Sequence, residues 1–329
     1  MKLQVPFLQL PLMFDADVLA KEINAVSEAA WMPHPAGLPG NSMLPLIAVD
    51  GDPANESFAG VMRPTPVLAR CPYLMQTMAS LGVILGRSRL MRLAGQAEVT
   101  RHADQGYYWV ERMRVHVPIV TQPTVRFECG DAAINMAAGE CWVFDTWRQH
   151  RVLNDDMQSR VHLVVDTVGG DGFWQLMGKG RPHSAPVDGW QPQRLAPQPD
   201  ARPELICETS NVPVVMSPWE LRAHLSLLFT DAVPHPQLAV AQQIVGRFYQ
   251  RWRSLWAQHG DRPSGHAQFR AVLEQFMAEI SGPAQPLMLK NELVWLGALS
   301  AMIARFAIGQ EPPRGDQVVH QARQAADNG

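Results

Sequence analysis

Residues that bind metal recur in the middle of the chain. His102 and Asp104 form a His-x-Asp pair, and His150 follows further along. Two imidazoles and one carboxylate on one side of a metal leave the opposite positions open, which suits Fe(II) binding a cosubstrate and O₂ together. Arg160 comes shortly after His150, and a guanidinium grips a carboxylate through two parallel hydrogen bonds. These residues predict an iron site with an arginine that anchors an acidic cosubstrate.

A His-x-Asp triplet alone is weak evidence, because the chain has 11 histidines. A second copy, His259-Gly260-Asp261, follows a helical pattern over 237–258 and precedes a proline, so a helix end and a turn explain it. The first copy ends an extended run over 97–102 and precedes several alternating segments. Its context therefore favours the first copy as the metal site.

Short β-type segments fill residues 87–166. Between 112 and 120 the side chains alternate, with Arg112, Arg114 and His116 on one side and Met113, Val115 and Val117 on the other. Two interpretations stay open for the polar side: a solvated outer face, or a pocket inside a barrel that binds a dicarboxylate. The second needs an anionic ligand, because burying unpartnered arginines is costly. About seven short strands with turn residues between them predict a jelly roll or cupin-type double-stranded β-helix.

The expected fold class is α+β, with a catalytic β domain followed by an α-helical one. With 47% hydrophobic and 18% charged residues, the composition is that of a globular protein. The expected parts are a jelly-roll domain over 1–178, a Pro-rich linker or strap over 179–213, a helical domain over 214–310 and a polar tail over 311–329. Helices are predicted at 218–230, 237–258, 264–281 and 287–308, the first after a capping-box start at Ser217. Two roles stay open for them: clamping substrate over the barrel mouth, or building a homodimer.

Charge, hydropathy and cysteine content bound the partners and the compartment. A net charge of −3 gives no basic field for nucleic acid. No run approaches the ~20 uninterrupted apolar residues of a membrane span. The four cysteines show no CxxC spacing, which fits a reducing cytoplasm. We therefore expect a cytoplasmic protein without a nucleic-acid or membrane partner.

Aromatic residues and the other histidines are harder to assign. Tyr107, Tyr108 and Trp109 follow Asp104 closely, and they either pack in a core or let Tyr108 and Trp109 form a wall of the substrate site. His162 is ambiguous. The remaining histidines in loops, turns and the tail are expected at the surface: His34, His183, His235, His259, His266 and His320.

Taken together, four motifs resemble a known family. They are His102-x-Asp104; Arg112-x-Arg114-x-His116-x-Pro118-Ile119; Ala138-Gly139-Glu140-x-Trp142-x-Phe144-Asp145 followed by His150; and Arg160-x-His162-Leu163-x-x-Asp166. This combination resembles the aspartyl/asparaginyl β-hydroxylase family of 2-oxoglutarate dioxygenases, including its bacterial proline-hydroxylase-like members. The resemblance covers roughly residues 60–170.

The resemblance implies a role for each matching residue. His102, Asp104 and His150 would bind iron, as in the three-ligand bacterial form. Arg160 would pair with the distal carboxylate of 2-oxoglutarate, and His116 would contact the cosubstrate near the metal. Arg114 and Arg112 would face a substrate or cosubstrate carboxylate. The chain departs from the animal enzyme at Met91-Arg92, where that enzyme has a serine that holds 2-oxoglutarate.

Three functions are compatible with these patterns. The favoured one is a hydroxylase that converts 2-oxoglutarate to succinate and CO₂ while hydroxylating an unactivated C–H bond. Its substrate would be a free amino acid, a peptide or protein residue, or a natural-product intermediate. The alternative is a non-catalytic metal-binding cupin with a helical interaction or sensing module. A third, a cupin enzyme that needs no 2-oxo acid, would leave Arg160 without a role.

Overall fold

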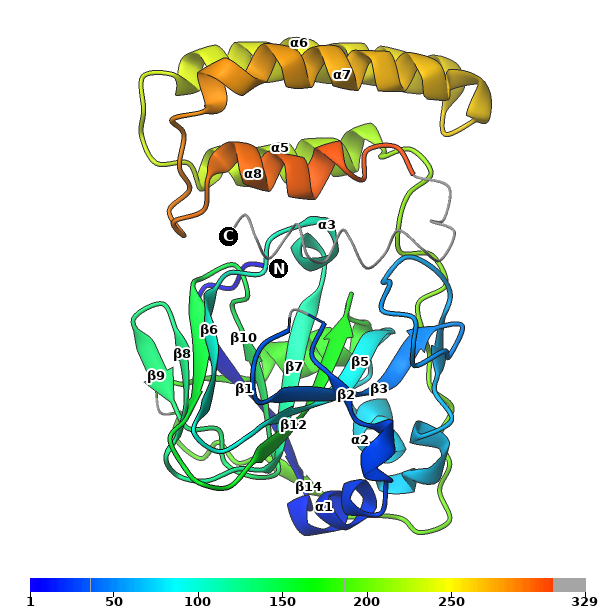
Figure 1. Cartoon of the computed structure of the whole chain (residues 1–329), viewed down its shortest axis with the longest axis vertical. Coiled ribbons are helices and arrows are strands. Elements are labelled where there is room, and N and C mark those ends of the chain that lie inside the picture. Colours follow the sequence, from blue (N-terminus) through cyan, green and yellow to red (C-terminus); the bar gives the residue numbers. More distant parts are fainter. Residues whose placement is uncertain (36, 186, 310–329) are drawn as a thin grey trace. The chain divides into compact units, whose positions relative to one another are not determined.

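The computed structural model describes residues 1–35, 37–185 and 187–309 (Figure 1). These residues cluster into two compact units. The first unit holds 1–102 and 111–211, and the second holds 103–110 together with the described residues from 212 onward. The fold is mixed, with large antiparallel sheets and separate helices. The predicted tail over 311–329 lies outside the described residues, and the predicted domain boundaries stay predictions.

Two sheets form the body of the first unit. Its strands pair antiparallel, except that β14 runs parallel to β1. Across the large sheet the order is β13 (Arg181–Pro182), β1 (Phe7–Phe14), β10 (Glu140–Phe144), β7 (Met113–Val120), β12 (Arg160–Thr167), β5 (Leu85–Leu93), β3 (Asn41–Val49) and β2 (Met32–Pro33), with β14 (Gln193–Leu195) beside β1 and β4 (Met62–Pro64) beside β3. The small sheet has the order β6 (Ala97–His102), β11 (His150–Asn154), β8 (Val125–Cys129) and β9 (Ala132–Ile134).

The large sheet has an apolar core on each face. One face packs against α1 (Ala16–Asn24) and α2 (Pro72–Ser80), and Leu19 and Leu74 of these helices belong to the same buried cluster as Val115 and Leu163 of the sheet. The other face meets the small sheet in a second core that contains Phe7, Leu93, Val125, Phe127, Cys129, Met136, Trp142, Phe144 and Val152. Because neighbouring residues of a strand point to opposite faces, each strand of the large sheet contributes to both layers.

The structure shows where the polar side of the alternation over 112–120 points, in β7 and in its neighbour β12. The side chains of Val115 and Leu163 enter the helix-covered core, so the polar set points the other way, toward the small sheet. That set is not solvated, since His116 is 5% exposed and Arg160 3%. The interpretation of this side as a solvated outer face is therefore wrong.

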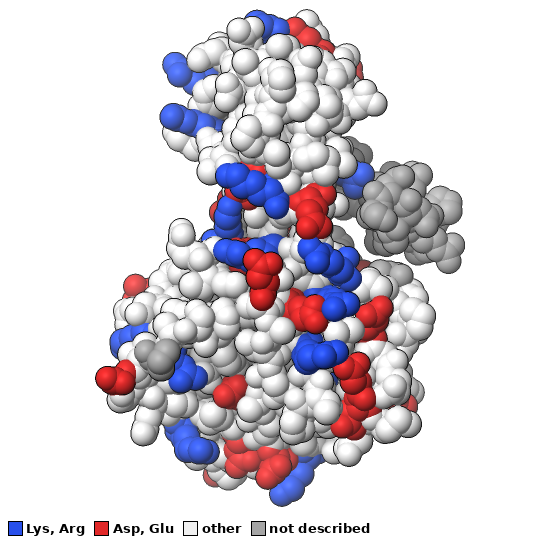
Figure 2. Space-filling model, turned by 90° about the vertical axis from the view of Figure 1, so that its left-hand side faces the viewer, with Lys and Arg blue, Asp and Glu red and all other residues white. Residues whose placement is uncertain are grey.

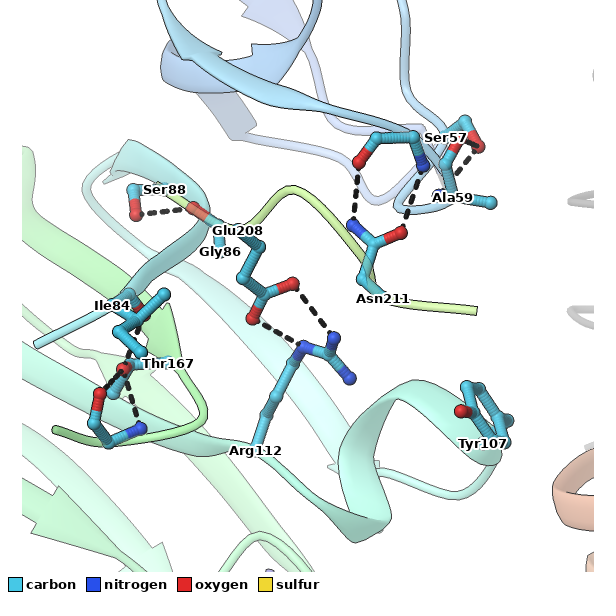
Figure 3. Close-up of polar contacts among 12 residues, drawn as sticks. Ser57, Ala59, Ile84, Gly86, Ser88, Tyr107, Arg112, Thr167, Glu208 and Asn211 are labelled. Carbon is cyan, nitrogen blue, oxygen red and sulfur yellow. Dashed lines mark hydrogen bonds and ion pairs between the residues drawn. The ribbon is translucent and has the colours of Figure 1, made fainter. Parts of the chain in front are cut away.

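Residues 204–211 lie against the sheet like an added strand. Cys207 forms a parallel bridge with Leu85, whose N–H donates to the Ile206 carbonyl at 2.8 Å. The Glu208 carbonyl accepts from the Met62 N–H at 2.8 Å. Asn211 closes the stretch by exchanging two 2.9 Å hydrogen bonds with the backbone of Gly60. We call residues 204–211 the strap; Figure 3 shows its side-chain contacts.

The second unit is helical. Its predicted first helix is α5, which starts where the Ser217 side chain accepts from the Glu220 N–H. The predicted last helix, 287–308, is shorter in the structure, because Met288 and Val294 bridge to each other before it starts. The helices are α3 (Tyr107–Val110), α5 (Pro218–Thr230), α6 (Leu238–His259), α7 (His266–Ala284) and α8 (Trp295–Leu299), with a π-helical turn over Ser300–Ala304 and a 3₁₀ turn over Pro263–Gly265. The first unit also contains α4 (Asp171–Gly178) and 3₁₀ turns over Glu28–Ala30 and Leu68–Arg70.

Surface charges are mixed in sign. On the face seen in Figure 2, basic and acidic side chains lie interspersed among uncharged ones. Charges of both signs also lie side by side on the small sheet, where Arg126 pairs with Asp155 and Arg151 pairs with Glu128. Among the helices of the described ranges, none has the length and apolarity to cross a membrane.

Candidate active site

Strand pairing brings the predicted metal ligands together. His150 lies directly opposite His102 in the β11–β6 pair, and their ring centroids are 4.3 Å apart. Asp104 follows two residues after His102, just past the end of β6. One ligand atom from each of His102, Asp104 and His150 lies within 4.8 Å of the other two. This spacing lets a single ion bind all three residues.

The backbone sets the tautomer of both histidines. His102 Nδ1 lies 2.7 Å from the Thr100 carbonyl, and His150 Nδ1 lies 2.9 Å from the Arg148 carbonyl. A carbonyl oxygen only accepts, so each Nδ1 carries the hydrogen and each Nε2 keeps its lone pair. A metal-binding histidine needs this arrangement, in which one ring nitrogen donates to a fixed acceptor and the other ligates. Two imidazoles and a carboxylate form a donor set that fits Fe(II).

Arg160 is a buried cation that has no counter-ion among the residues the structure describes. It begins β12, and its side chain is 3% exposed. Burial lowers its pKa to about 10, which leaves it charged at neutral pH. Its Nε has no hydrogen-bond partner, and among the described residues no carboxylate pairs with it. Because an uncompensated buried charge is costly, this part of the first unit is suited to an anion.

His116 and His162, like Arg160, are buried between the large sheet and the small sheet. Their Nδ1 atoms are 3.3 Å apart, and neither Nε2 has a hydrogen-bond partner within the described part of the chain. Burial, followed by the charge of Arg160, lowers the pKa of each well below the ordinary 6.5. His116 also packs edge-on against Phe127 and Phe144 at 5.3 and 5.4 Å. Both imidazoles are therefore neutral at physiological pH.

The two remaining arginines of the motif have acidic partners. Arg114 Nε donates to Asp166 Oδ1 at 3.0 Å, and the Arg114 side chain is 13% exposed. Arg112 forms two hydrogen bonds, of 3.0 and 2.8 Å, with the carboxylate of Glu208 in the strap (Figure 3). Both side chains of that second pair are nearly inaccessible, at 3% and 2%. The predicted role of Arg112 in substrate binding stays a prediction, and this pairing does not support it.

The predicted aromatic wall lies in α3. Tyr108 is 2% exposed, and its ring meets Trp109 at 4.7 Å. Tyr107 packs inside the second unit, with its hydroxyl 2.6 Å from Glu220 and its ring stacked on Phe306 at 5.1 Å. Tyr107 therefore has a packing role, and the wall formed by Tyr108 and Trp109 stays a prediction.

Several residues near the site escaped the sequence-based analysis. His34, expected at the surface, is partly buried, and its pKa falls to about 4 through burial and then through Arg89, Arg114, Arg87 and His102. Two of these neighbours are on β5, where Arg89 lies opposite Val164 of β12. The alternation of Arg87 and Arg89 along Leu85–Leu93 was a signal that could have revealed them.

The position where the animal enzymes carry a serine has a different environment. Met91 lies opposite His162 in the β5–β12 pair. Arg92 donates to Ser42 and Glu28 at 2.9 Å each and stacks over the Trp31 ring at 4.3 Å. The side-chain contacts of Arg92 are therefore with Ser42, Glu28 and Trp31, and not with Arg160 or His162.

Comparison with known proteins identifies the region that carries the site. The family model for aspartyl/asparaginyl beta-hydroxylase matches residues 58–169, about a third of the chain. No curated protein matches the sequence significantly.

Three solved structures illustrate the structural similarity. A Pseudomonas putida prolyl-4-hydroxylase is 17% identical, with 50% of this chain and 92% of that one covered and a TM-score of 0.35. An oxidoreductase of the 2OG-Fe(II) oxygenase family from Burkholderia pseudomallei is 16% identical (51% and 88% covered, TM-score 0.35). HygX from Streptomyces hygroscopicus, solved with nickel, 2-oxoglutarate and hygromycin B, is 10% identical (51% and 84% covered, TM-score 0.34).

The matched residues include all three predicted metal ligands, His116 and Arg160. The resemblance drawn from the sequence is therefore confirmed over this region. Residues 58–169 thus match the aspartyl/asparaginyl β-hydroxylase family model, and within them lie the three residues that fit a metal ion and the arginine that fits an acidic cosubstrate.

Proposed function

We propose that this protein hydroxylates an unactivated C–H bond of an amino-acid residue or an amino-acid-like molecule, while 2-oxoglutarate is converted to succinate and CO₂. We also propose that the two facing sheets of the first unit form a double-stranded β-helix of the cupin type, followed by a helical domain. The finer fold and the substrate class both rest on the residues of the site.

The unpaired buried charge of Arg160 is the observation that carries the proposal. A fold that only bound metal would gain nothing from a guanidinium at 3% exposure without an acidic partner. A dicarboxylate supplies the missing counter-ion, and its other end is then free to reach the metal ligands. Arg160 and His150 follow each other on β12 and β11, which belong to the two facing sheets.

The residues of the chain divide the work of the reaction. His102, Asp104 and His150 would hold Fe(II), which supplies the activation of O₂ when bound. Arg160 would bind the distal carboxylate, and His116 would donate a hydrogen bond from its neutral ring. The aromatic rings of Phe127 and Phe144 keep water from this layer, since both are at most 3% exposed. In such a dry layer each hydrogen bond to an anion is stronger than in water.

The substrate side of the site is basic. Arg87, Arg89 and Arg114 all lie close enough to affect His34, which in turn is affected by the metal ligand His102. A substrate that carries a carboxylate close to the reacting carbon fits this surrounding. A free amino acid meets that requirement through its α-carboxylate, a residue of a peptide or protein meets it when its side chain is acidic, and a natural-product intermediate meets it when it retains a carboxylate.

An anaerobic titration tests the proposal. Fe(II) and 2-oxoglutarate are added to the metal-free protein, and the visible metal-to-cosubstrate charge-transfer band is recorded. His150→Ala is expected to abolish the band, and Arg160→Ala to shift its appearance to much higher 2-oxoglutarate concentrations. Arg126→Ala is the matched control, because that arginine forms an exposed ion pair with Asp155.

The alternative function gives a different result in the same titration. Iron that binds to the wild-type protein without any band on adding 2-oxoglutarate would contradict the proposal and favour the non-catalytic metal-binding cupin. If the band forms, succinate release on admitting O₂ with candidate amino acids then identifies the substrate.

A further inference from the structure

The contact between His116 and His162 joins two neutral rings through the same kind of atom. Each neutral imidazole has one N–H and one bare nitrogen. At 3.3 Å between the two Nδ1 atoms, one ring donates and the other accepts. The pair therefore has two arrangements, and in each of them the tautomer of one ring fixes that of the other.

The two arrangements present opposite groups at the far side of His116. If His162 Nδ1 donates, His116 carries its hydrogen on Nε2 and offers a donor. If His116 Nδ1 donates, its Nε2 is bare and offers only an acceptor. Neither Nε2 has a partner among the described residues, so nothing else in that part of the chain fixes the choice.

The surroundings of His116 decide which arrangement suits an anion. His116 is close enough to Arg160, Arg114 and His150 for their charges to act on it, whereas His162 is affected only by Arg160 and His116. His116 also shares its ring neighbours Phe127 and Phe144 with the metal ligand His150, so His116 lies on the side of the metal ligands and His162 lies behind it. An acceptor nitrogen beside a carboxylate would repel it, while an N–H would bind it.

We propose that His162 is a positioning residue that donates from Nδ1 to His116 and so keeps the hydrogen of His116 on Nε2, facing the acidic cosubstrate. This inference rests on the proposed function for the identity of the anion. It assigns a role to His162, which the sequence analysis left without one. It also makes His116 a donor that needs no proton from solvent.

Nitrogen-15 NMR of the histidine rings tests the tautomer directly in metal-free protein, without cosubstrate. The signals of His116 are assigned by their loss in His116→Gln. In the wild type we expect the hydrogen of His116 on Nε2 and a bare Nδ1. In His162→Leu we expect the Nε2–H tautomer to become the minor one, at about a tenth of the population for a tenfold rise in Kd, because the donor that fixes it is gone. A hydrogen on Nδ1 of wild-type His116, or an unchanged tautomer in His162→Leu, overturns the inference.

Binding measurements separate positioning from packing. His162→Leu is expected to raise the Kd for 2-oxoglutarate about tenfold, as is usual when the group that orients a binding imidazole is removed. In His162→Asn the side-chain amide offers an N–H near the position of Nδ1, so the Kd should stay within about twofold of wild type. Circular dichroism and thermal unfolding confirm that both variants fold. Equal losses in Leu and Asn variants would point to packing and overturn the inference.

A double variant completes the test. In His116→Gln the side-chain amide reaches the position of Nε2 and has no tautomer to set. Adding His162→Leu to that background should therefore change the Kd by less than about twofold, and a full tenfold change would overturn the inference. If the wild-type protein has the expected tautomer but binds no 2-oxoglutarate, the proposed function is contradicted. The inference about the tautomer then stands, but its cosubstrate is wrong.

Discussion

Two buried arginines of this molecule have the same exposure and opposite surroundings. Arg112 and Arg160 are each 3% exposed. Arg112 lies under the strap with both oxygens of the Glu208 carboxylate on its guanidinium, while Arg160 has no acidic partner in the described structure. Burial alone thus does not separate a structural charge from a functional one. The presence or absence of a counter-ion within the chain does.

The largest expected effect follows from removing the counter-ion of Arg112. Glu208→Gln removes one charge of a buried ion pair and should lower the free energy of unfolding by about 3–5 kcal/mol. Urea denaturation of the metal-free protein measures it. A loss below about 1 kcal/mol would mean that other groups compensate the charge of Arg112. The two arginines would then not differ in the way proposed.

Replacing Arg160 should affect ligand binding and leave stability intact, the opposite of Glu208→Gln. Arg160→Met removes an uncompensated buried charge, so the unfolding free energy of the metal-free protein should stay the same or rise. The affinity for 2-oxoglutarate should fall at least about a hundredfold, in the range for losing one partner of a buried ion pair. Isothermal titration calorimetry under anaerobic conditions measures the second effect. A variant with unchanged affinity would show that the pocket anchors no anion.

The positive surroundings of the site should also be visible in the pH dependence of stability. The pKa of folded His34 is about 4 against an ordinary 6.5, first through burial and then through the nearby arginines. The unfolded chain therefore binds a proton at this histidine where the folded chain does not. Its contribution to stability is complete above pH 6.5 and is lost as the pH falls from 6.5 to about 4. The slope is at most about 1.4 kcal/mol per pH unit.

Comparing urea denaturation of wild type and His34→Gln over that pH range isolates this contribution, since His116 and His162 titrate in both proteins. The variant should show the shallower slope. Parallel curves would mean that neither burial nor the arginines of β5 and β7 lower the pKa of His34 in the folded protein.

The smallest effect is expected for a pair that lies at the surface. Arg151 and Glu128 are 40% and 29% exposed and join β11 to β8. Glu128→Gln should cost no more than about 1 kcal/mol of unfolding free energy, because solvent screens both charges. This variant is the matched control for Glu208→Gln. A cost comparable to that of Glu208→Gln would mean that burial does not distinguish the two pairs.

Local patterns of the sequence predicted most of the β region. Alternation along 112–120 predicted β7 to within a residue, and β8, β10 and β11 all lie in the stretch 87–166 where short strands were predicted. The side-chain period of two also predicted that Arg114 and His116 share a face, away from Val115. The metal ligands followed from residue type and from their positions at strand ends.

What could not be predicted depends on contacts between distant segments. Glu208 meets Arg112 across 96 positions of the chain, and nothing in the composition of the Pro-rich stretch marks this one glutamate. The His116–His162 contact likewise joins two strands 46 positions apart. His34 precedes a turn, and only the folded sheet brings it near three arginines. Such features are set by tertiary pairing, which no local period encodes.

The hydrogen bonds from His102 and His150 to the carbonyls of Thr100 and Arg148 have an evolutionary consequence. The acceptors are main-chain atoms, so any residue type at positions 100 and 148 leaves them in place. Neither hydrogen bond therefore constrains the side chain at its position, although the Arg148 side chain has a separate ion pair with the buried Asp145 at 3.0 Å. His116 has no such protection if its tautomer depends on a side chain. Related sequences should then change at positions 116 and 162 together, while position 100 varies independently of the site.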